Sequence, residues 1–86
     1  MHHTVSVGQL YRIRLTTSFL YYDEAGWAIT YHRLQPGDIL LVVSKQRSLT
    51  HVLIHDRRLI IKTRDIEIDI QEGYAECISD DSCIQP

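Results

Sequence analysis

Hydrophobic and polar residues alternate along most of the chain. In "DIEIDI" (65–70), three isoleucines alternate with three acids, and "LYRIRLT" (10–16) and "RLIIKT" (58–63) follow the same rule at most positions. A period of two is the signal of a β-strand that turns one face to the core and the other to solvent. No segment combines a helical period with capping residues. The pattern therefore predicts an all-β protein.

One stretch, "LQPGDILLVV" (34–43), breaks the alternation. The turn signal Pro36-Gly37-Asp38 runs directly into five apolar residues, Ile39–Val43. Alternation fails where a strand is covered on both faces, as in a strongly bent strand that contributes to two sheets of a small closed barrel. The apolar run predicts such a strand.

Five strands are predicted in total, in one domain of 86 residues. They are Leu10–Leu15, Asp38–Ser44, Leu49–His55, Arg58–Thr63 and Ile66–Gln71. Between the first two lies a long aromatic loop, Thr16–Leu34, which includes an irregular hairpin around the turn at Asp23–Gly26. The short polar breaks between the later strands suit antiparallel neighbours. The barrel is expected over about residues 8–72 and an acidic tail over about 73–86.

With this order of elements, the chain resembles a Src-homology-3-like small barrel. The resemblance is carried by "LQPGDILLVV" and by "FLYYDEAGW" (19–27), which is similar to the acidic, aromatic loop of the peptide-binding members. It implies that the first and last strands pair, which would set Arg12 and Arg14 beside Glu67 and Asp69. The tryptophan pair and the aromatic and proline residues of the peptide-binding members have no counterparts here. A groove for proline-rich ligands is therefore not expected.

The formal net charge of −2 conceals a strong polarity along the chain. Six basic residues and one acid lie between Lys45 and Arg64, whereas seven acids and no Lys or Arg follow from Asp65 onward. Such asymmetry can indicate a nucleic-acid surface. Pairing of oppositely charged neighbouring strands, at roughly 0.2–1 kcal/mol per pair, is the favoured interpretation. No apolar run approaches the ~20 residues that span a bilayer, so no membrane partner is expected.

The two cysteines, Cys77 and Cys83, have a C-x5-C spacing that is not a zinc signature. No export signal is recognisable in "MHHTVSVGQL". Reduced thiols and a cytoplasmic location are therefore expected.

Metal and catalytic chemistry find little support. His51 and His55 would share one face of a strand about 13 Å apart, at ~3.3 Å per residue, whereas zinc ligands lie ~2.1 Å from the metal. His32 or Asp56 could join one of these histidines, but nothing in the spacing requires it, so no metal and no cofactor are predicted. The chain has no G-x-S-x-G, no H-E-x-x-H and no phosphate-cradling glycine loop. The sequence predicts a protein that is not an enzyme.

The long loop is the favoured functional candidate, because five of the seven aromatic residues lie between positions 19 and 31. Exposed Tyr and Trp beside acids are typical of protein-recognition surfaces. The predicted protein-binding residues are Tyr21, Tyr22, Asp23, Trp27 and Tyr31. Trp27 and Tyr22 flank the turn and are the expected anchors, whereas Tyr11 alternates with core residues. Core packing of all these loop aromatics remains the alternative.

These observations predict a non-enzymatic protein-interaction module. By analogy with small free-standing barrels, it would be an accessory or phage-encoded protein that binds a larger protein or assembly. The alternative is a nucleic-acid or nucleotide binder. The residues of that alternative site are Lys45, Arg47, Arg57, Arg58, Lys62 and Arg64. An open sheet edge at the long loop would also permit homo-oligomers.

Overall fold

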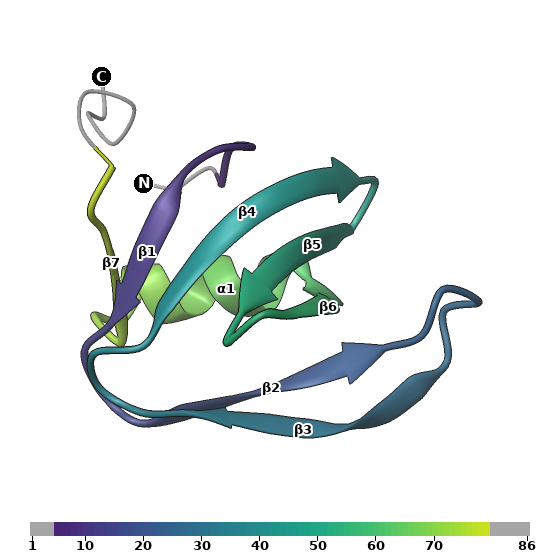
Figure 1. Ribbon diagram of the computed structural model, residues 1–86, viewed down its shortest axis with the longest axis horizontal. Coiled ribbons are helices and arrows are strands. Elements are labelled where there is room, and N and C mark those ends of the chain that lie inside the picture. Colours follow the sequence, from purple (N-terminus) through teal and green to yellow (C-terminus); the bar gives the residue numbers. More distant parts are fainter. Residues whose placement is uncertain (1–4, 80–86) are drawn as a thin grey trace.

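A computed structural model describes residues 5–79, which form one seven-stranded antiparallel sheet and one short helix (Figure 1). The elements are β1 (Leu10–Ile13), β2 (Thr17–Tyr22), β3 (Ala28–Leu34), β4 (Ile39–Gln46), β5 (Leu49–Ile54), β6 (Arg57–Lys62), α1 (Thr63–Gln71) and β7 (Ala75–Cys77). The strand order is β3-β2-β6-β5-β4-β1-β7. The prediction of a mainly β protein is confirmed. The sheet has seven strands instead of five, and it does not close into a barrel, because β3 and β7 are its two edges.

Strands β4, β5 and β6 follow one another through two short turns. The β5–β6 turn is formed by His55 and Asp56, whose φ angles are +49° and +61°. Positive φ at both residues of a two-residue loop gives the twist that matches the flanking strands. The three strands therefore form a continuous antiparallel meander.

The apolar run in β4 is not covered on both faces, as the sequence had suggested. Leu40 and Val42 are buried, whereas Ile39 is 40% exposed. The register of β4 against β5 shifts between Val42 and Ser44. Such a bulge bends a strand locally. Before the bulge, β4 pairs with β1 through residues 39–41, and it pairs with β5 from Leu41 to Gln46.

The predicted last strand, Ile66–Gln71, is a helix instead. Alternating isoleucines also occur at i and i+4, which is the spacing of one helix face. Ile66 and Ile70 have this spacing and are buried on the same face of the helix. Ile68 lies on another face and is 42% exposed. The helix ends at Gln71 with Glu72 as its C-cap, and Gly73 follows with a φ of +84°, the left-handed conformation that suits glycine after a helix.

The end of α1 is closed by two backbone hydrogen bonds. The Tyr74 N–H donates to the Asp69 carbonyl at 2.8 Å, and the Gly73 N–H donates to the Ile70 carbonyl at 3.2 Å. This pattern is a Schellman motif. Gly73 is therefore a stop signal that the alternation-based prediction did not use.

The first and last strands of the chain do pair, but the last strand is β7. Arg12 lies opposite Glu76 in the β1–β7 register, and its Nη2 binds Glu76 Oε2 at 2.7 Å. This hydrogen bond lowers the pKa of the Glu76 carboxyl. The predicted contacts of Arg12 and Arg14 with Glu67 and Asp69 are wrong, because those acids lie on α1. Of the predicted acidic tail, 75–77 form β7, and 80–86 lie outside the described residues.

The predicted long loop contains the irregular hairpin that was expected, β2–β3, whose register shifts between Tyr21 and Tyr22, and Figure 1 shows its tip reaching beyond the other strands. The side chains of Phe19 and Leu34, near the base of the hairpin, are buried in the core. Tyr11 is also buried, as expected, and burial raises the pKa of its hydroxyl to about 12. The other buried members of the core are Val5, Ile13, Leu40, Val42, Val52, Ile54, Leu59, Ile61, Ile66, Ile70 and Ala75.

Cys77 is disulfide-bonded, so the expectation of reduced thiols is not met there. Cys83 lies outside the described residues. The cytoplasmic location was inferred partly from free thiols, and that support is lost. Among residues 5–79, no helix is long and apolar enough to cross a membrane.

The helical assignment of 63–71 predicts different effects for two neighbouring isoleucines. Ile66→Ala removes a fully buried side chain and is expected to lower the free energy of unfolding by about 2–5 kcal/mol. Ile68→Ala changes an exposed side chain and is expected to cost less than about 1 kcal/mol. Urea denaturation measures both. Equal, large losses would instead place all three isoleucines of the segment on one buried strand face.

Candidate functional site: a groove beside the aromatic hairpin

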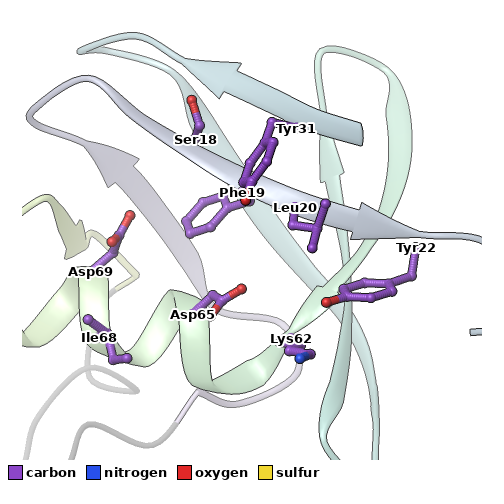
Figure 2. Close-up of a pocket in the computed structure, with 9 residues that line it drawn as sticks. All are labelled: Ser18, Phe19, Leu20, Tyr22, Tyr31, Lys62, Asp65, Ile68 and Asp69. Atoms are coloured by element: carbon purple, nitrogen blue, oxygen red, sulfur yellow. The ribbon is translucent and has the colours of Figure 1, made fainter. Parts of the chain in front are cut away.

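A pocket of about 340 Å³ lies between the β2–β3 hairpin and α1 (Figure 2). The hairpin supplies one wall, the end of β6 supplies Lys62, and the helix supplies the other wall. Its lining residues are Ser18, Phe19, Leu20, Tyr22, Tyr31, Lys62, Asp65, Ile68 and Asp69. The pocket exists because the hairpin folds over the helix, so neither element forms it alone.

Two carboxylates and the Lys62 ammonium are the charged groups that line this pocket. Asp65 and Asp69 are one helical turn apart, and Figure 2 shows both side chains on the helix face that looks toward the hairpin. Asp69 Oδ2 accepts a hydrogen bond of 2.7 Å from the Thr17 hydroxyl. Burial, opposed by that bond and assisted by the charge of Asp65, raises the pKa of the Asp69 carboxyl. Burial therefore disfavours the ionised form of Asp69.

Aromatic side chains form the opposite wall. Figure 2 shows the phenol of Tyr22 reaching into the pocket from one end, with Tyr31 above it on β3. The Lys62 ammonium lies 5.7 Å from the Tyr22 ring, within the range of a cation–π contact. The Tyr22 ring thus already has one cation–π contact within the chain, with Lys62.

The hollow surface continues past Tyr22 toward β5 and β6. A second pocket, of about 300 Å³, is lined by Tyr21, Tyr22, Asp23, Glu24, Ile29, His51, Arg57, Arg58, Leu59 and Ile60. A third, also of about 300 Å³, shares Asp23, Glu24, His51 and Ile60 with the second. We call these three adjoining pockets the hairpin groove. It runs from α1 past Tyr22 to the hairpin tip and the β5–β6 strands.

The predicted protein-binding residues lie on one hairpin but have different surroundings. Trp27 and Tyr31 are 74% and 67% exposed, whereas Tyr21 and Tyr22 are half-buried. Tyr21 packs edge-on against His32 and under Arg57, so it holds β2, β3 and β6 together. Asp23 Oδ1 accepts hydrogen bonds from the Ala25 and Trp27 amides, which shapes the tip. The alternative that all the loop aromatics pack in the core is wrong for Trp27 and Tyr31.

The predicted nucleic-acid residues are divided between the two ends of the β5–β6 hairpin. Leu49 pairs with Lys62 at one end of the β5–β6 hairpin, and Ile54 pairs with Arg57 at the other. The five residue steps of β6 from Arg57 to Lys62 span about 16 Å. Lys45, Arg47 and Arg64 belong to the first end by chain position, and Arg58 belongs to the second.

Three of these cations also have partners within the chain. The Lys45 ammonium donates to the Val5 carbonyl at 2.6 Å, Arg57 lies over Tyr21, and Lys62 lies over Tyr22. A phosphate would have to compete with each of these contacts. The structure thus weakens the basis for a phosphate-binding surface here.

Two histidines lie close together, His32 on β3 and His55 in the β5–β6 turn. His55 Nε2 lies 2.9 Å from Asp38 Oδ1, and the His32 ring lies 6.2 Å from the His55 ring. Burial, Arg57 and His55 lower the pKa of His32, and Asp38 opposes this. Within residues 5–79, no group of three or more His, Cys, Asp or Glu could hold a metal ion. His51 lies within β5, where it pairs with Ser44 of β4 and Ile60 of β6.

No protein-family model, curated protein or solved structure matches this chain. Its function is therefore inferred from the geometry and chemistry of the hairpin groove.

The raised pKa of Asp69 predicts a pH-dependent effect of Asp69→Asn. The folded state binds the Asp69 proton more tightly than the unfolded state, so ionisation costs stability once the pH exceeds both pKa values. Asn keeps an oxygen for Thr17 and removes the charge. The variant is expected to be more stable than the wild type at pH 7, and the difference should vanish near pH 3. Thermal melts at both pH values measure it, and a less stable variant at pH 7 would contradict the assignment.

Proposed function

We propose that this protein is a non-enzymatic interaction module that binds a protein partner in the hairpin groove. The observation that carries the proposal is the pocket lined by Tyr22, Tyr31, Asp65 and Asp69, on a hairpin whose tip also carries the exposed Trp27. Exposed Trp and Tyr are the residues that most often dominate binding energy at interfaces. The module needs no cofactor for this role.

The pocket beside α1 specifies the chemistry of the proposed partner. Asp65 and Asp69 line this pocket together with Lys62, whereas Asp23 and Glu24 line the second pocket together with Arg57 and Arg58. An Arg or Lys side chain entering the α1 pocket would neutralise the half-buried Asp69 and stack on a tyrosine ring. The proposed partner is therefore an extended protein segment with at least one basic side chain.

We also propose that the sheet is an open variant of the Src-homology-3-like architecture. Three features support this. Strand β1 lies between the last strand, β7, and β4; strands β4, β5 and β6 are joined by short turns; and the hairpin is inserted between β1 and β4. The architecture hosts many unrelated functions, so it adds nothing to the partner's identity. An accessory or phage-encoded role is compatible with a module of this size.

The first test of the proposal is capture of a partner by three alanine variants. Tyr22→Ala and Trp27→Ala are expected to lose about 2 kcal/mol or more of partner binding each while melting close to the wild-type temperature. Tyr11→Ala removes a buried ring and is expected to cost roughly 3–5 kcal/mol of stability instead. Tagged protein in nuclease-treated lysate of the source cells, read by quantitative mass spectrometry, measures binding. Undiminished capture by a folded Tyr22→Ala protein would rule out the groove as the site.

The second test examines whether the pocket beside α1 recognises the basic side chain that is proposed for the partner. N-acetyl-arginine amide is expected to shift backbone amide resonances around Asp65, Asp69 and Tyr22, whereas its neutral isostere N-acetyl-citrulline amide is not. Asp65→Asn should abolish the shifts, and Glu72→Gln at the exposed end of α1 should not. Equal responses to both amides would exclude charge recognition.

The same protein titrated with labelled DNA and RNA tests the rival function. Phosphate-driven binding weakens steeply with salt, by a log–log slope of about −0.9 per phosphate neutralised on duplex DNA. We expect only weak binding at physiological salt, because the basic residues are divided between two ends of β6. Tight binding there would favour the nucleic-acid alternative over the groove.

A further inference from the structure

The outer edge of β3 is unpaired in the described part of the chain. β3 has seven residues and hydrogen-bonds only to β2. Its residues from Ala28 to Tyr31 are exposed on both faces, so neither α1 nor another strand covers this edge. The opposite edge of the sheet, β7, has only three residues. β3 is therefore the long open edge of the molecule.

This edge carries few of the features that keep sheet edges apart. Such edges are usually protected by Lys, Pro or inward-pointing charges. Between Ala28 and Leu34 the only Lys, Arg, Asp, Glu or Pro is Arg33. A bulge is another protecting feature, and β3 has one, because the adjacent Tyr21 and Tyr22 pair with Thr30 and Ala28 and leave Ile29 as the extra residue.

The two ends of β3 carry opposite charges. Asp23 and Glu24 lie at the hairpin tip beyond its first residue, and Arg33 lies near its last. Neither Glu24 nor Arg33 has an ion-pair partner among the described residues. Ala28 and Arg33 alone are separated by about 17 Å of extended strand. Glu24 and Arg33 of one chain therefore cannot neutralise each other.

We propose that β3 pairs with β3 of a second copy of this chain, antiparallel and about a two-fold axis near Thr30. The antiparallel arrangement brings each acidic tip to the Arg33 end of the other copy. A parallel arrangement would set tip against tip and Arg33 against Arg33. Two-fold pairing also limits this contact to two copies, because the β3 edge of each copy is then occupied by the other.

The dimer goes beyond the proposed function, because it uses the outer edge of the hairpin and the partner uses the groove. Tyr22, Asp65 and Asp69 line the groove on the side of β2 that faces the helix. Edge pairing leaves these side chains in place. One dimer would thus present two hairpin grooves, which would strengthen binding to a partner with repeated basic segments.

Light scattering coupled to size-exclusion chromatography, with a concentration series, tests the dimer. The wild type is expected to have twice the mass of the chain at high concentration. Thr30→Lys places two ammonium groups near the axis and is expected to give a monomer. Arg33→Glu and Glu24→Arg are each expected to weaken the dimer roughly tenfold by opposing like charges. The double variant is expected to restore wild-type affinity.

Arg14→Glu, an exposed change outside the hairpin, is the control for altered net charge. Circular dichroism establishes that Thr30→Lys folds, and the charge-swap pair tests the same edge if it does not. A wild type that stays monomeric, a dimer that persists in Thr30→Lys and Arg33→Glu, or a double variant as weak as its parents would each overturn the proposal. Capture of the partner by Tyr22→Ala judges the groove separately, so the two ideas fail independently.

Discussion

The attachment of the β2–β3 hairpin to the sheet is the constraint on which the rest of the molecule depends. β2 meets β6 at only two residue pairs, Tyr21 with Ile61 and Tyr22 with Ile60. So short a junction cannot hold an arm of thirteen strand residues by backbone hydrogen bonds alone. Burial of Phe19 and Leu34 at the base fixes the arm to the core. The groove, its charges and the open edge all follow from the angle this anchoring imposes.

The anchoring also explains why Tyr21 and Tyr22, adjacent in sequence, have different roles. Alternation turns Tyr21 toward His32 and Arg57, where it packs, and turns Tyr22 toward Lys62 and the α1 pocket. One residue stiffens the arm while its neighbour offers a ring to a partner. A binding surface on a hairpin is most precise when its reverse face is fixed in this manner.

The sequence predicted the strands well where residues are half-buried, and it failed where one pattern fits two structures. Leu10–Ile13, Leu49–Ile54 and Arg57–Lys62 lie within or close to their predicted spans. "DIEIDI" satisfies both a strand and a short helix, since positions i and i+4 share a face in each. Only tertiary burial of Ile66 and Ile70, with Gly73 as a stop, decided between them.

The same ambiguity hid part of the candidate site. Tyr22, Trp27 and Tyr31 were found from composition, because aromatic residues at a loop tip are hard to bury. Asp65 and Asp69 were assigned to an outer strand face, and nothing local shows that α1 lies under the hairpin. Contacts between residues 17 and 69, such as the Thr17–Asp69 hydrogen bond, come from the fold alone. The i, i+4 spacing of the two acids was the one available signal.

The pairing of β1 with β7 has a consequence for how the chain acquires its structure. Tyr11 lies opposite Cys77, so this edge of the sheet joins residues separated by most of the polypeptide. Contacts of such sequence separation carry a large loop-closure cost and tend to form late. During synthesis β4 follows β1 much sooner than β7 does, so β1 has only β4 as a neighbour until residues 75–77 have been made. The outer edge of β1 is therefore a second exposed strand edge in every molecule in which β7 has not yet docked.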